Sequence, residues 1–143
     1  MATWLYQLSA NRWSPERYRA DVWEGERWRY SVGRTVGGGE TPKPGDTVVF
    51  FYAKHENTDP GFYGWGVLLD GHEPTETLSF RPTAPSDFLK MTPWWDEEAD
   101  RLADTIRGNV PLATLFLVKD EDARKLRAGI IAWLARAKAS ETA

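Results

Sequence analysis

The chain has 143 residues, of which 41% are hydrophobic and 27% charged, a composition typical of one soluble globular domain. It contains no cysteine, which excludes disulfides, thiolate metal sites and cysteine nucleophiles and suits a reducing cytoplasm. A net charge of −3 argues against a general electrostatic attraction to nucleic acid. The sequence has no signal-peptide pattern and no apolar stretch that could cross a bilayer, so we expect a cytoplasmic protein without a membrane segment.

The first predicted element is a strand at residues 3–8, where apolar side chains alternate along the chain. Ser14-Pro15-Glu16 then predicts the start of a short helix. Residues 22–34 mix aromatic and charged side chains with neither a clear helical nor a clear strand period. Residues 35–45 are expected to form a loop that ends in the turn signal Pro44-Gly45.

In the second half of the chain, the apolar run at residues 47–53 predicts a strong buried strand. A helix is predicted at residues 96–107, followed by Gly108 as its stop, and Asp120 is expected to cap a final helix. Further strands are predicted at 62–69, 77–81 and 112–118. Without repeats or linkers, the sequence predicts one α+β domain over residues 1–138, with a C-terminal tail at 139–143. We expect a mostly antiparallel curved sheet or barrel with peripheral helices.

An arginine-rich, aromatic segment between Arg12 and Arg34 is the most informative part of the sequence for function. It holds six arginines, no lysine and four acids, interleaved with tryptophan and tyrosine. Arginine contacts phosphates through two donors and stacks on aromatic planes, which lysine does less well. Trp23 and Trp28 lie among charged residues in this segment, which favours a ligand-binding role such as stacking on a base.

The sequence has little that points to catalysis or to a bound metal. The two histidines, His55 and His72, fall in predicted loops and have no second ligand at helical spacing. The glycines at 37–39 lack the lysine and hydroxyl residue of a phosphate loop. We therefore predict no enzyme activity, no metal and no cofactor. The apolar setting of three other aromatic residues predicts core packing for Trp4, Phe116 and Trp133.

Several short motifs resemble EVE domains, which belong to the PUA-like superfamily and are related to YTH readers. The segment Trp23-Glu24-Gly25-Glu26-Arg27, followed by Tyr30 and Arg34, is similar to their tryptophan–acid–glycine–x–arginine–asparagine–tyrosine signature. The order of the flanking motifs is also similar: TWLYQLS, Lys43-Pro44-Gly45-Asp46 before VVFFYA, GFYGWGVL, and LATLFLVKDEDARKL. The resemblance covers nearly the whole chain and implies a PUA-like curved β-barrel of about five or six strands with peripheral helices.

The sequence departs from the EVE pattern at three places near the expected pocket. Trp28 stands where the family has asparagine, with Arg29 inserted before Tyr30. The family's serine–glutamate–proline is replaced by Ser9-Ala10-Asn11, and its alanine in the later strand is replaced by Trp65. The resemblance implies a pocket that receives a flipped, modified base, such as 5-methylcytosine or N6-methyladenine, in an aromatic cage.

From the residues and the resemblance together, we expect a monomer that recognises a modified base in DNA or RNA. Trp23 is the predicted stacking wall, and the second wall is predicted to be Trp28, Tyr30 or Trp65. The predicted hydrogen-bonding residues at the base edge are Ser9, Asn11 and Ser31. The predicted phosphate contacts are Arg12, Arg27 and Arg34. The pair Trp94-Trp95 is expected to pack against the barrel rather than to close its rim.

Two other classes of function fit parts of the sequence. One is a PUA-like (ASCH-type) ribonuclease or nucleobase hydrolase that would use Tyr30, Lys54 or a loop histidine. The other is a module that binds a methylated amine or another small ligand in its cage through cation–π contacts.

Overall fold

The computed structural model describes most of the predicted strands and both of the later helices. The residues described are 2–8, 28–31, 35–36, 40, 42–53, 60–68, 77–84, 93–108 and 115–142. Within these ranges, the backbone alone is described at residues 8, 28–31, 35–36, 77–84, 134 and 137–142.

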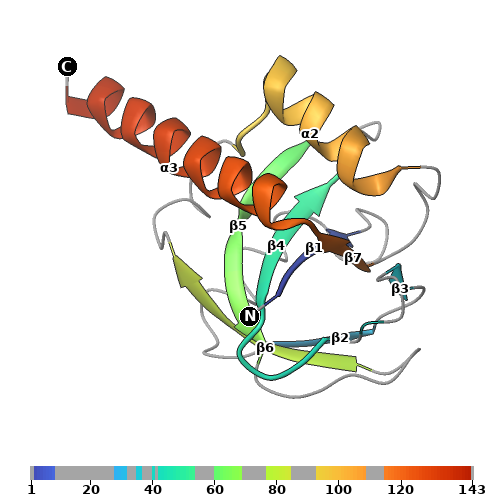
Figure 1. The fold of residues 1–143 in the computed structure, drawn as a ribbon. Coiled ribbons are helices and arrows are strands. Elements are labelled where there is room, and N and C mark those ends of the chain that lie inside the picture. Colours follow the sequence, from blue (N-terminus) through green and yellow to red (C-terminus); the bar gives the residue numbers. More distant parts are fainter. Residues whose placement is uncertain are drawn as a thin grey trace.

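Seven strands form one mixed sheet, ordered β2-β6-β5-β4-β1-β7-β3 (Figure 1). The parallel neighbours are β1 with β4 and β3 with β7, and the other four pairs are antiparallel. The strands are β1 (Thr3–Leu8), β2 (Trp28–Ser31), β3 (Thr35–Val36), β4 (Thr47–Tyr52), β5 (Gly61–Leu68), β6 (Thr77–Ala84) and β7 (Leu115–Val118). Two helices, α2 (Glu97–Arg107) and α3 (Asp120–Thr142), pack beside the sheet.

The prediction of a PUA-like barrel of five or six strands is wrong for the part of the chain that the structure describes. The sheet has seven strands and is open, because its two end strands, β2 and β3, do not pair with each other. A barrel requires the end strands to share a hydrogen-bond ladder. Alternation in the sequence identifies strands, but it does not determine which strands become neighbours. The central parallel pair β1–β4, whose strands are distant in the sequence, was therefore also missed.

Most individual elements lie close to their predicted ranges. The strand at 3–8 and the helix ending at Arg107 are confirmed, with Asp96 as N-cap and Gly108 as C-cap. A short strand, β2, lies in the segment without a clear period. The last helix continues to Thr142, so residues 139–142 extend α3 rather than form a separate tail. None of the described helices is long and apolar enough to span a membrane.

The centre of the sheet is buried on both faces, and this explains the continuous apolar run of β4. Leu5, Val49 and Phe51 belong to a core shared with the helices, which includes Leu102 of α2 and Leu126 of α3. The alternate positions carry large side chains that are equally inaccessible on the opposite face, among them Trp4, Tyr6, Phe50 and Tyr52. The predicted core roles of Trp4 and Phe116 are confirmed by exposed fractions of 0% and 1%. Trp133 is only partly buried against the helix-side core.

Asp46 joins the first strand to the turn before β4. The turn Lys43–Asp46 closes with a backbone bond from Asp46 N to Lys43 O of 3.1 Å, and Gly45 has a φ of 90° that favours glycine. The Asp46 carboxylate, in a residue that is 5% exposed, accepts three hydrogen bonds. The donors are the Ala2 amide at 3.1 Å, the Trp4 indole at 3.1 Å and the Lys43 amide at 3.0 Å.

Trp94 connects the sheet to both helices. Its backbone exchanges two hydrogen bonds with Phe62 of β5, each 3.1 Å. Its indole donates to Asp96, whose other carboxylate oxygen accepts from Ala99 N at the start of α2. The same ring lies against Gly129 of α3, where an added Cβ would meet the ring at 2.1 Å. Trp94 is therefore core, as expected, and Trp95 packs partly buried against the same core.

Replacing Asp46 with alanine should lower the free energy of unfolding by about 3 kcal/mol, since buried donors would lose a charged acceptor. Urea unfolding followed by tryptophan fluorescence measures this change. Glu40→Ala, at an exposed residue, is the control and should shift stability by under about 0.5 kcal/mol. An Asp46→Ala variant as stable as the control would show that the three bonds contribute little.

Gly129→Ala should destabilise the protein although alanine favours helix by about 1 kcal/mol. The new Cβ would press on a ring held by Phe62 and Asp96, and overpacking of this kind costs about 1–3 kcal/mol. Thermal unfolding should show a lower midpoint for Gly129→Ala, and adding Trp94→Phe, which shortens the opposing ring, should cost less than the sum of the two single changes. A higher midpoint for the single variant would contradict the close approach.

Candidate nucleic-acid interface

The predicted site residue whose side chain the structure describes is Trp65, in the middle of β5. It pairs with Val49 of β4 on one side and with Ala84 of β6 on the other, next to a register shift between Trp65 and Gly66. Trp65 and Val67 are partly exposed, whereas Gly66 between them is buried. Trp65 packs against the helix-side core, so it lies on the face that carries the helices, as does its partner Val49.

Arginine positions flank this part of the sheet. Val67 is in register with Arg81 of β6, and Arg29 of β2 pairs with Ser79, two residues from Arg81. Because alternate residues of a strand share a face, positions 29 and 81 lie on the same face as Trp65 and Val67. On the other side of Val67, its partner Thr47 accepts a hydrogen bond of 2.9 Å from Arg127 of α3.

We define the Trp65 strip as Trp65, Val67 and Thr47 together with the positions of Arg81 and Arg29. Neighbouring strands are about 4.8 Å apart, so the strip spans four strands, from β4 to the edge strand β2. Figure 1 shows β6 and β2 running across the direction of β4, at the end of the sheet away from α2. A partly exposed tryptophan with arginine positions on the same face supplies the residue types needed to stack a base and to contact phosphates.

The other predicted cage residues of the described chain do not share this face. Trp28 is in register with Phe80, and Phe80 is in register with Leu68. Leu68 is three residues from Trp65 in the same strand, so it lies on the opposite face of the sheet. Tyr30, two residues from Trp28, occupies the same face as Trp28. The sheet therefore separates the positions of Trp28 and Tyr30 from that of Trp65. Ser31 is the last residue of β2, in register with Thr77, and lies on the Trp65 face by the same alternation.

The remaining predicted site residues lie outside the described residues. They are Ser9, Asn11, Arg12, Trp23, Arg27 and Arg34, and the same holds for Lys54, His55 and His72. Ser9 directly follows β1, whose end is in register with the end of β4. Within the described ranges, no group of three histidine, aspartate or glutamate side chains is arranged to hold a metal ion.

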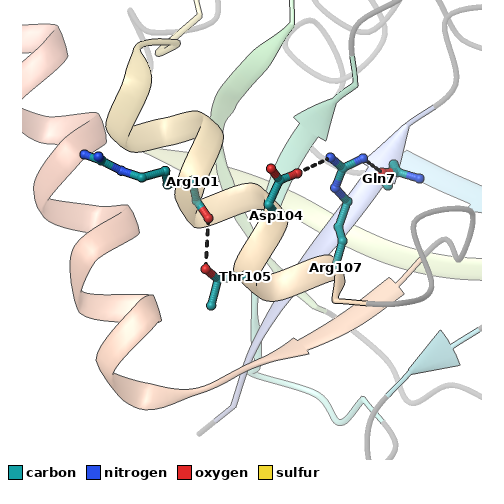
Figure 2. Close-up of polar contacts among 5 residues, drawn as sticks. All are labelled: Gln7, Arg101, Asp104, Thr105 and Arg107. Atoms are coloured by element: carbon teal, nitrogen blue, oxygen red, sulfur yellow. Dashed lines mark hydrogen bonds and ion pairs between the residues drawn. The ribbon is translucent and has the colours of Figure 1, made fainter.

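A polar cluster that the sequence did not predict links α2 to the first strand (Figure 2). Arg107 donates to Gln7 Oε1 at 3.2 Å and to Asp104 Oδ1 at 3.1 Å, and its guanidinium lies over the Phe51 ring at 5.3 Å. The Arg107 side chain is 17% exposed, and its Nε atom is buried with no hydrogen-bond partner among the described residues. Asp104 balances its charge, so this cluster is suited to joining α2 to the sheet rather than to binding an anion.

Sequence reasoning also missed the cations of α3, although their signal is visible in the sequence. Residues 123–140 contain five cations and no acid: Arg124, Lys125, Arg127, Arg136 and Lys138. This run of cations without acids could have been recognised from the sequence as a second basic segment, in addition to residues 12–34.

Comparison with known proteins shows the fold and no family. No family model matches the sequence, and no curated protein matches it. Among solved structures, protein PSPTO5229 from Pseudomonas syringae is similar at 14% identity, with a TM-score of 0.53, covering 90% of this chain and 99% of that one. A hypothetical protein from Leishmania major has 10% identity and a TM-score of 0.52, covering 100% and 98%. Rpa0253 from Rhodopseudomonas palustris has 13% identity and a TM-score of 0.52, covering 90% and 92%.

These likenesses concern the arrangement of the backbone, and the resemblance to EVE domains stays a prediction.

Arg107→Ala should lower the free energy of unfolding by about 1–2 kcal/mol, because it removes packing on Phe51 and the bond to Gln7. Arg101→Ala is a matched control on the same helix: the Arg101 side chain is 72% exposed and pairs with Glu97, which is 88% exposed. That change should cost under about 0.5 kcal/mol. Equal effects of the two variants in urea unfolding would contradict the anchoring role of Arg107.

Proposed function

We propose that the protein is a binding module that recognises a modified base in nucleic acid. The observation that carries the proposal is the partly exposed residue Trp65, on a face of the sheet where arginine positions follow on the neighbouring strands. Stacking on an aromatic side chain is worth about 1–3 kcal/mol per base, and arginines beside it supply phosphate contacts.

The local structure around Trp65 favours a binding role over simple core packing. Trp4 and Trp94 are buried core residues. Trp65 instead stands at a register shift between β5 and β6. Such irregularities are over-represented beside functional sites, because they redirect a side chain.

The arginine-rich segment of residues 12–34 supports the same function. It contains β2, the edge strand of the Trp65 strip, and Arg27 directly precedes that strand in the sequence. In the proposal, Trp23 completes the stacking site, with Ser9, Asn11 and Ser31 at the base edge and Arg12, Arg27 and Arg34 on phosphates. Trp28 and Tyr30 would belong to a second wall only if the ligand reached the opposite face.

Trp65→Leu should weaken binding to an oligonucleotide carrying 5-methylcytosine or N6-methyladenine by roughly 5- to 100-fold, from the loss of one stacking surface. Leucine keeps an apolar side chain against the core, and circular dichroism checks that the variant is folded. Fluorescence anisotropy with modified and matched unmodified oligonucleotides, single- and double-stranded, measures the change.

Trp95→Leu is the matched control, since Trp95 is another partly buried tryptophan against the same core. Its affinity should stay within about twofold of the wild type. If the wild type shows no preference for any modified oligonucleotide, base recognition is overturned. If Trp28→Ala abolishes binding and Trp65→Leu does not, the base lies on the opposite face.

A further inference from the structure

The long helix α3 separates its charges along its length. The acids Asp120, Glu121 and Asp122 occupy its first turn, where they suit the positive end of the helix dipole. From residue 123 to 140 the helix carries cations alone. A protein with a net charge of −3 therefore contains a helical segment with five positive charges.

Three arginines of this segment are exposed and have no acidic partner within the described residues. Arg124, Arg127 and Arg136 are exposed, whereas Lys125 pairs with Glu121 at 3.5 Å. At about 100° per residue, Arg136 lies about 120° around the helix from Arg124 and about 180° from Arg127. Arg127 donates to Thr47, and the Arg136 guanidinium lies 5.4 Å from the Trp133 ring centre. Two of the three are thus held in place by the protein itself, which lowers the entropy lost when they bind a ligand.

We propose that the solvent face of α3 between Arg124 and Arg136 binds the phosphate backbone of nucleic acid. The inference rests on the proposed function, in which nucleic acid is the ligand. Its geometric basis is continuity, because Arg127 contacts Thr47 and Thr47 belongs to the Trp65 strip. Arg124 and Arg136 are twelve residues apart, or about 18 Å along a helix and about 120° around it.

The packing of α3 favours nucleic acid over a membrane surface. A helix that lies in a bilayer interface needs a wide free apolar face. The apolar residues Ala123, Leu126 and Ile130 are instead buried against the protein, and Trp133 is partly buried there. Ile131, at 55% exposed, is the one large exposed hydrophobic residue within the described chain. The face available for binding is therefore cationic rather than apolar.

The test measures how the affinity for an unmodified oligonucleotide depends on salt concentration. Each phosphate contact that is removed lowers the slope of log K against log salt by about 0.7–0.9. Arg124→Gln, Arg127→Gln and Arg136→Gln should each have this effect, and the triple variant should lose about 2 units of slope. Arg101→Gln on α2 removes the same charge from an exposed residue that already pairs with Glu97, and it should leave the slope unchanged.

The outcomes separate this inference from the proposed base recognition. If the α3 variants change the slope no more than Arg101→Gln does, the inference is overturned, even where Trp65→Leu abolishes preference for the modified base. If the slope falls as expected but modified and unmodified oligonucleotides bind equally, α3 binds phosphates and base recognition fails. Binding to vesicles containing phosphatidylserine without binding to oligonucleotides would also overturn the inference.

Discussion

The buried carboxylate of Asp46 is the polar contact on which the arrangement of the central strands depends. Its three donors come from Ala2, Trp4 and Lys43, so one side chain fixes the beginning of β1 against the turn before β4. Backbone bonds from Gly45 and Leu68 then continue the same junction into β5. A buried charge is tolerated only when hydrogen bonds replace its water. Here the need to satisfy Asp46 also sets the parallel register in which Thr3 lies beside Thr47.

This junction explains how one sheet can serve two purposes. Towards the helices, Phe51 and Phe62 are fully buried, and Trp94 completes the packing against α2 and α3. Near the beginning of β4, the same face becomes partly exposed at Thr47, Trp65 and Val67. The well-packed end can hold the strands in register, while the accessible end carries the side chains that are proposed to bind a ligand. Sites on rigid strands keep their geometry more accurately than sites on loops.

Local sequence patterns predicted where most of the described strands and helices lie. They did not predict which strands pair with each other. The strand at 3–8 and the Asp96 and Gly108 caps follow from alternation and capping chemistry. The open sheet order does not, because a parallel neighbour for β1 depends on contacts more than forty residues away, such as Trp4 with Asp46. The same limit of sequence patterns applies to the candidate site. Trp65 and Trp28 both look like ligand-binding residues in the sequence, but only register shows that the sheet lies between their positions.

The net charge of the chain is a poor guide to the local potential of α3, because most of the cations of this helix lie apart from the acids of its first turn. The acids of α2 and α3 are concentrated in their first turns, where they stabilise the helix ends. Arg136 is fourteen residues from Asp122, or about 21 Å along a helix, well beyond a Debye length of about 8 Å at physiological salt. A phosphate near Arg136 would therefore be attracted by the nearby cations and only weakly repelled by the acids of the first turn, and the nearer acid is Glu141, five residues along the helix. The charges that stabilise the helix and those proposed to bind the ligand can coexist because solvent screens them from each other.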